Sequence, residues 1–196
     1  MSTKHGFRVE ILDRSWITAK VIEGNQKDLA FEYLGVGEHL AAHRLGPADY
    51  ARMQRLEDLE KVIQDPAAYE GQPGQRAADA LSAALLSREL ERPRFETDGR
   101  FQRAIRLADD HGLLRQRLDA RYQMLWTAFY WFDDFDLLDR EYDAFAEMVL
   151  ASDMARNVEL VGNLTQNLVN LVMHGHRSAE QVKLAARMER LVDRLK

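Results

Sequence analysis

The sequence predicts an all-α fold, either a helical bundle or a stack of antiparallel α-hairpins, for three reasons. Apolar residues recur at three- and four-residue spacing through most of the chain after about residue 27. The breaks between these segments are short and hold Gly, Pro and Asp, as turns between antiparallel helices do. A chain of 196 residues with 46% hydrophobic residues can bury one core. We therefore expect a single domain over 1–196, with 1–92 and 99–196 as an alternative division into an N-terminal helical subdomain and a C-terminal helical-hairpin subdomain.

The first 25 residues fit two patterns. Apolar and charged residues alternate over 7–11, and β-branched residues crowd 16–22, which favours short strands. The spacing of apolar residues from Val9 to Ala19 equally fits one face of a helix. We favour a helix over 15–23 and keep short strands as the alternative.

The later helices are predicted from their apolar stripes and from the breaks between them. Pro47 follows Gly46 and suits the first turn of a new helix. Residues 64–74 and 91–99 hold Pro and Gly, which interrupt helices, and we read both as loops. We expect helices at 28–45, 47–63, 76–90, 99–111, 113–132, 135–151, 155–174 and 178–195.

The C-terminal half carries a weak internal repeat. When 131–149 is placed on 171–189, at an offset of forty, Ala146 falls on Ala186 and Met148 on Met188. This length is typical of α-hairpin repeats, and the pattern resembles tetratricopeptide-like and HEAT-like superhelices in outline, without their residue signature. An irregular bundle fits as well.

Composition excludes several classes of function. A net charge of −5 offers no general attraction to nucleic acid or to an anionic membrane, so we expect neither as a partner. The chain has no cysteine, which excludes a disulfide framework, a thiolate metal site and a cysteine nucleophile. No apolar run approaches the length of a membrane-spanning helix, and the first residues lack the apolar stretch of a secretory signal. We expect a cytoplasmic protein, and the preference for arginine over lysine favours a bacterial or phage origin.

A dense aromatic segment from Trp126 to Phe135 runs directly into a cluster of carboxylates. Its aromatic half predicts a helix that is apolar around most of its circumference and central in the core. The alternative is that Trp131 and one neighbour stay at the surface as anchors for a partner. For the carboxylates we favour helix capping by Asp133 or Asp134 over a calcium loop, because Leu138 stands where such a loop needs an oxygen ligand.

The same segment supplies our candidate binding surface. Like charges beside aromatic residues repel one another in the free protein, and a protein partner with a basic surface would relieve that repulsion. The predicted partner-binding residues are Trp131, Asp133, Asp134, Asp136, Asp139, Tyr142 and Asp143.

Motifs for catalysis and cofactors are weak. His39 and His43 are one helical turn apart but lack an obvious third ligand, so we expect no metal, and no cofactor motif stands out. Arg106 and His111 have the Arg-x4-His spacing of HEPN-type helical ribonucleases, a resemblance confined to six residues. It implies His111 as a base and Arg106 as a stabiliser of the phosphorane across a dimer. We favour instead a helix that ends at His111 and Gly112.

These observations favour a non-catalytic intracellular protein that binds another protein, as a regulator, an adaptor, or an inhibitor of the immunity type. The alternative is a helical enzyme, either a HEPN-like ribonuclease or a carboxylate-metal hydrolase. The sequence leaves open whether the protein forms a homodimer.

Overall fold

The computed structural model describes residues 7–13, 16–21, 47–152 and 154–195. Contacts divide the chain into two units, Met1–Gln54 and Arg55–Lys196, with the boundary inside one helix. The helices on either side of the predicted loop at 91–99 pack against each other.

The N-terminal unit contains a β-hairpin. Strand β1 (Phe7–Asp13) pairs antiparallel with β2 (Trp16–Val21), so that Phe7 lies opposite Val21. The helix that we favoured over 15–23 is therefore wrong. β-Branched side chains restrict the rotamers available in a helix and fit a pleated strand, and here that preference prevails. The helix expected at 28–45, and with it the pair His39 and His43, lies outside the described residues.

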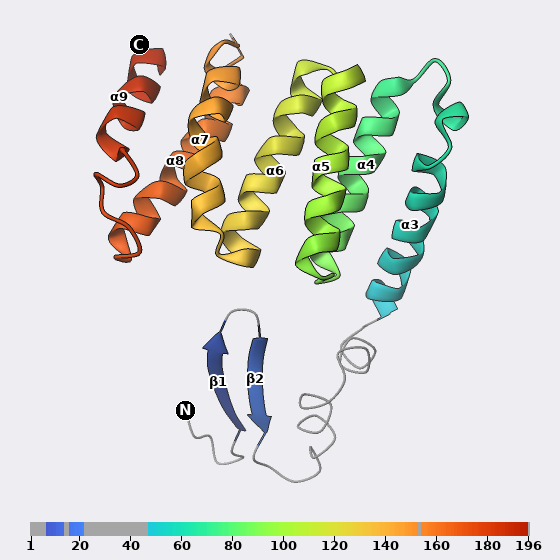
Figure 1. The fold of residues 1–196 in the computed structure, drawn as a ribbon, viewed down its shortest axis with the longest axis horizontal. Helices are drawn as coiled ribbons and strands as arrows, with labels where there is room; N and C mark the ends of the chain where they lie inside the picture. Colours follow the sequence, from blue (N-terminus) through green and yellow to red (C-terminus); the bar gives the residue numbers. More distant parts are fainter. Residues whose placement is uncertain (1–6, 14–15, 22–46, 153, 196) are drawn as a thin grey trace. The chain divides into compact units, whose positions relative to one another are not determined.

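The rest of the described chain is helical, which confirms the all-α prediction. Figure 1 shows the helices of the larger unit following one another as a row of antiparallel elements. They are α3 (Pro47–Ile63), the short 3₁₀-helix η1 (Pro66–Tyr69), α4 (Pro73–Glu89), α5 (Arg94–His111), α6 (Leu114–Phe132), α7 (Phe135–Leu150), α8 (Ala155–Met173) and α9 (Leu184–Leu195).

Two helix starts differ by more than a turn from their predicted positions. Helix α5 begins at Arg94, well before 99, because Gly99 is accommodated inside the helix with open space around it. Helix α9 begins at Leu184 and not at 178. The side chain of Ser178 accepts a hydrogen bond from the backbone N–H of Gln181 (3.1 Å), and Lys183 adopts a left-handed backbone with φ of 47°, which delays the helix.

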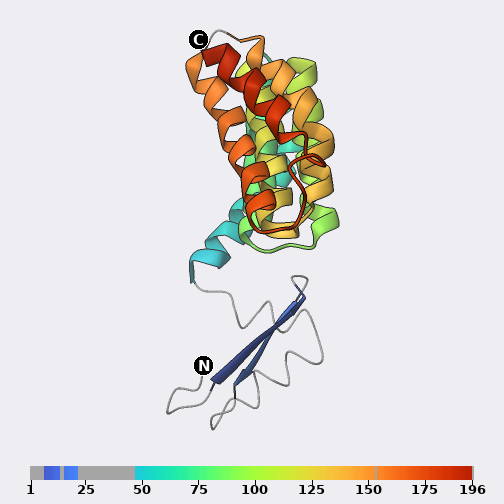
Figure 2. The same ribbon diagram turned by 90° about the vertical axis from the view of Figure 1, so that its left-hand side faces the viewer.

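Packing among the described helices follows chain order. Each helix from α4 to α9 packs against its neighbour in the chain, and α4 with α6, α6 with α8, and α7 with α9 are also in contact. This pattern belongs to a stack of α-hairpins, in which each element meets only those close to it in sequence. We call the three helices α4, α6 and α8 the even layer. Figure 2 views the row from the side on which α9 lies.

The stack has a period of 41 residues. Helices α4, α6 and α8 begin at 73, 114 and 155, and α5 and α7 begin at 94 and 135. The buried residues repeat with the helices. In α5 these are Thr97, Phe101, Ala104, Ile105 and Ala108, and 41 residues later in α7 they are Leu138, Tyr142, Phe145, Ala146 and Val149. The offset of forty in the sequence differs from this period by one residue. It pairs the buried Ala146 with the exposed Ala186, so it does not mark equivalent positions.

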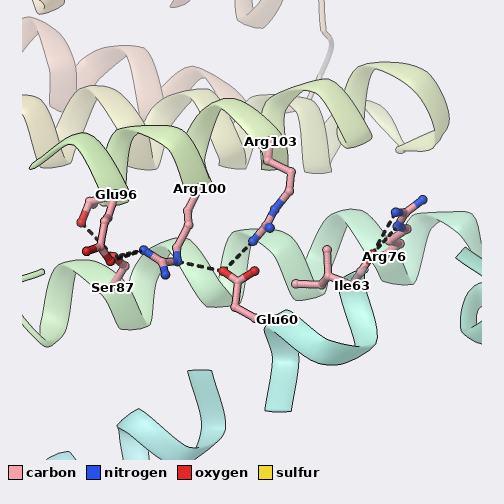
Figure 3. Close-up of polar contacts among 8 residues, drawn as sticks. Glu60, Ile63, Arg76, Ser87, Glu96, Arg100 and Arg103 are labelled. Atoms are coloured by element: carbon pink, nitrogen blue, oxygen red, sulfur yellow. Dashed lines mark hydrogen bonds and ion pairs between the residues drawn. The ribbon is translucent and has the colours of Figure 1, made fainter. Parts of the chain in front are cut away.

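Helix α3 is held to the stack by apolar burial and by one carboxylate. Leu56, Leu59 and Ile63 are buried in the common core. Figure 3 shows Glu60 accepting hydrogen bonds from Arg100 Nε (2.8 Å) and Arg103 Nη2 (2.7 Å), both on α5. Burial alone would raise the pKa of Glu60, but the two guanidinium groups outweigh it and the pKa is lowered.

Candidate functional site

Most of the predicted acidic residues already have cationic partners within the chain. Asp134 caps α7 by accepting from the Leu137 N–H (2.9 Å), as predicted, and also pairs with Arg94. Burial raises the pKa of Asp134, but these contacts prevail and hold it below its usual value. Asp136 accepts from Arg177 Nη2 (2.6 Å). Asp133 has a left-handed backbone and ends α6.

Asp139 and Asp143, one turn apart on α7, share a single arginine from α9. The side chain of Arg187 is 4% exposed and contacts both carboxylates, with Arg187 Nη2 2.9 Å from Asp143 Oδ2. The same guanidinium donates to the backbone carbonyls of Val182 and Asp139, at 2.9 and 3.0 Å, and lies over the ring of Tyr142. Its hydrogen bonds lower the pKa of Asp143, which burial alone would raise. These two carboxylates therefore join α7 to α9.

The two predicted aromatic members of the surface fall in different places. Tyr142 is 2% exposed and is hydrogen-bonded to Thr165, so the expectation that it presents an edge to a partner is wrong. It is buried because it faces the seam between α7 and α8, 41 residues after the buried Phe101. Trp131 is 41% exposed, and its neighbour Tyr130 is 43% exposed. This arrangement matches the alternative of a surface tryptophan with one neighbour.

Arg106 and His111, the catalytic alternative, lie in the second half of α5, and both are exposed. Gly112 caps the end of that helix by donating its N–H to the Ala108 carbonyl (2.8 Å). A Cβ at position 112 would come within 2.6 Å of that carbonyl oxygen, so glycine is required there. The predicted end of the helix at His111 and Gly112 is confirmed.

Aromatic side chains of α6 meet amide side chains of α8 in the even layer. Along α6, the Tyr122 and Trp126 rings are 5.7 Å apart, and the Trp126 and Tyr130 rings 4.4 Å apart, measured between centroids. Two amide side chains of α8 form hydrogen bonds with these tyrosines. Tyr130 donates its hydroxyl to Asn167 Oδ1 (3.0 Å), and Asn163 donates to the Tyr122 hydroxyl (3.4 Å). These bonds fix the rings in one orientation, which lowers the entropy that a partner would have to remove on binding.

On the α4 side of the same layer, Arg88 lies over Trp131. The guanidinium carbon is 4.6 Å from the ring centroid, within the range of a cation–π interaction. Arg88 Nη1 donates to Gln123 Oε1 (3.1 Å) and Thr127 Oγ1 (3.3 Å), both on α6. Near its C-terminal end, α6 thus brings Trp131 to Arg88 of α4 and Tyr130 to Asn167 of α8.

A hollow of about 300 Å³ lies between α5, α6 and α7. Its walls include Ile105, Met124 and Met148, and its charged groups are Arg121, Arg140 and Glu141. Arg121 is paired with Asp109, and Arg140 with Glu141. The charges around this hollow are therefore balanced within the chain.

The described residues offer neither a cluster of metal ligands nor a membrane-spanning helix. No group of three or more His, Cys, Asp or Glu in that part of the chain could hold a metal ion. None of its helices combines the length and the apolar character needed to cross a membrane.

Comparison of the chain with protein-family models, with curated proteins and with solved structures finds no match in any of the three. The assignment of a site therefore depends on the residues themselves.

Arg88, Gln123 and Asn167 were not singled out from the sequence. Arg88 is 43 residues from Trp131, and Tyr130 is 37 from Asn167. These separations lie close to the 41-residue period, so a search for chemistry-bearing pairs about one period apart could have found them.

Proposed function

We propose that this chain is a non-catalytic protein-binding protein, a regulator, adaptor or inhibitor, that holds its partner on the even layer around Trp131 and Tyr130. The observation that carries the proposal is the exposure of two large aromatic side chains, at 41% and 43%, within a network that holds them in place. Tryptophan, tyrosine and arginine dominate the energetics of protein interfaces, and here Arg88 lies over Trp131, which follows Tyr130 in the chain.

The proposal shifts the surface from the carboxylates to the aromatic residues. The prediction of a basic partner depends on repulsion among carboxylates that have no cationic partner within the chain. Asp134, Asp136, Asp139 and Asp143 each contact an arginine of the chain, which removes that motive for these four. The aromatic part of the predicted surface, Trp131, is retained.

The test is capture of a partner from lysate of the native host by immobilised full-length protein, followed by binding of the purified partner by calorimetry. We expect Trp131→Ala to weaken binding by tenfold or more, which is about 1.4 kcal/mol or more. Phe95→Ala is the matched control, since Phe95 is an exposed aromatic residue of α5 outside the even layer.

Equal binding by wild type and Trp131→Ala would remove the even layer as the binding surface. The enzyme alternative has its own assay, cleavage of RNA by wild type compared with Arg106→Ala and His111→Ala. RNase activity that both substitutions abolish would replace protein binding with the HEPN-like function.

A further inference from the structure

Arg88 is a half-buried cation whose contacts are all with uncharged groups. Its Nη1 donates to a glutamine and a threonine, its guanidinium lies on Trp131, and its Nε is buried without a hydrogen-bond partner. None of the ion pairs among the described residues includes Arg88. The Nη2 group makes no hydrogen bond to a described residue and is not one of the buried unpaired atoms, so it is available to an acceptor from outside the chain.

Arg187 provides a comparison, because its guanidinium also lies over an aromatic ring. Both arginines are partly or wholly removed from water, and both lie within 5 Å of a ring centroid. Arg187 has two carboxylates, and its pKa is raised although burial alone would lower it. Burial lowers the pKa of Arg88, and the charge of Glu89 offsets this only in part. The carboxylate present at Arg187 is missing at Arg88.

We propose that Arg88 and Trp131 form the docking point for a carboxylate side chain of an acidic peptide segment of the partner. The inference rests on the protein-binding function proposed above and specifies the chemistry of that partner. A carboxylate at Nη2 would supply the counter-charge that the half-buried guanidinium lacks, through a charge-assisted hydrogen bond. An apolar side chain next to the acid would contact the exposed part of Trp131, which is 41% accessible.

Charge complementarity selects an acidic peptide over a nucleic acid. Binding to a phosphate backbone depends on several cations acting together, whereas one cation, Arg88, lies on the Trp131 ring. The groups that contact Arg88 are instead all uncharged: the Trp131 ring, the Gln123 amide and the Thr127 hydroxyl. One carboxylate with apolar neighbours matches that arrangement.

The experiment uses a synthetic array of dodecapeptides with varied flanks, in which one central position is Glu, Asp, Gln or Lys and a Leu or Phe lies two residues away. Full-length protein is the ligand, and the strongest binders are then measured in solution by fluorescence anisotropy. We expect Glu and Asp peptides to bind, and replacement of the acid by Gln to weaken binding about tenfold or more.

The matched variants are Arg88→Met and Arg140→Gln. Arg88→Met removes a cation without a carboxylate partner, which stabilises, and also two hydrogen bonds and the contact with Trp131, which destabilises. Its melting temperature should therefore stay close to that of the wild type. We expect Arg88→Met to bind the Glu peptide about tenfold or more weakly than the wild type does. We also expect it to bind Glu and Gln peptides alike, because the arginine and the peptide carboxylate form one interaction that either change removes. Arg140→Gln removes the same charge from an exposed position of α7 and should bind as the wild type does.

Three results would overturn the proposal: equal binding of Glu and Gln peptides by the wild type, unchanged binding by Arg88→Met, or binding of a single-stranded oligonucleotide that Arg88→Met abolishes. If acidic peptides fail while Trp131→Ala still loses the captured partner, protein binding stands and the acidic specificity alone fails. If Trp131→Ala loses nothing, the even layer fails as a binding surface, and this inference fails with it.

Discussion

Arg187 joins three elements through one side chain. It binds Asp139 and Asp143 of α7, a carbonyl of the turn before α9, and the face of Tyr142. Its removal would leave two like charges one turn apart beside a vacated guanidinium site. We expect Arg187→Met to lower the free energy of unfolding by about 2–4 kcal/mol, below the full cost of breaking a buried pair because both carboxylates are partly exposed to water.

Urea unfolding of the two proteins at pH 7 checks this value. Arg190→Met is the control, because Arg190 approaches Glu147 only at 3.7 Å between exposed side chains and should contribute little. A loss of the same size in both variants would show that Arg187 has no special role.

The lowered pKa of Asp143 predicts how stability depends on pH. Arg187 favours the ionised carboxylate in the folded state, so the folded pKa lies below the unfolded value of about 4. Between those two values the unfolded chain binds more protons, and stability therefore rises with pH. This contribution is complete above about pH 5 and is lost as the pH falls through the folded pKa.

The measurement compares urea unfolding of wild type and Asp143→Asn from pH 6 down to pH 3. We expect the difference in unfolding free energy between the two proteins to shrink as the pH falls. Glu60 and Asp134 also have lowered pKa values and will add to the acid sensitivity of both proteins alike. A difference that stays constant over this range would contradict the assigned ion pair.

At the scale of elements, the 41-residue period makes equivalent positions of different helices comparable. Phe101 of α5 and Tyr142 of α7 occupy the same place in successive hairpins and are both fully buried. Phe101→Ala would leave a cavity in the centre of the core. We expect a loss of about 3–5 kcal/mol in unfolding free energy. Phe95→Ala on the same helix, at 76% exposure, should change stability by less than about 0.5 kcal/mol.

Helix positions were largely predictable because they depend on local signals. Apolar spacing and breaks placed α6, α7 and α8 correctly, and the place of Asp133 and Asp134 before a helix predicted that one of them caps it. The predicted starts of α5 and α9 were wrong because local sequence did not determine the backbone there. Gly99 suggested a break and lies inside α5, and Lys183 gave no sign of the left-handed backbone that delays α9.

The candidate site was less predictable because it depends on register between helices. The acids of α7 looked unpaired in the sequence, but their arginines lie 40 to 48 residues away in neighbouring elements. The sequence also did not indicate Arg88 as a site residue. Nothing near it in the sequence shows that it lacks a carboxylate and lies on Trp131. Only the packed stack brings such groups together.

At the scale of the helical unit, packing in chain order has a consequence for cooperativity. The described helices contact neighbours and next-but-one elements, so the two ends of the stack share no direct contact. Stability in such a structure is close to a sum over elements and interfaces, and the ends can open by themselves. Damage at one end should therefore stay local.

Two substitutions, one near each end, test this consequence by native-state hydrogen exchange. Glu60→Ala removes the carboxylate that binds Arg100 and Arg103, and Arg187→Met removes the link between α7 and α9. We expect Glu60→Ala to accelerate exchange in the 55–63 part of α3 and leave α9 unchanged. Arg187→Met should accelerate exchange in α9 and leave α4 and α5 unchanged, because an opening at α9 exposes no contact made by those helices. Equal acceleration of all helices by either variant would mean that the stack opens as one cooperative block, and that its interfaces are stronger than the intrinsic instability of each helix.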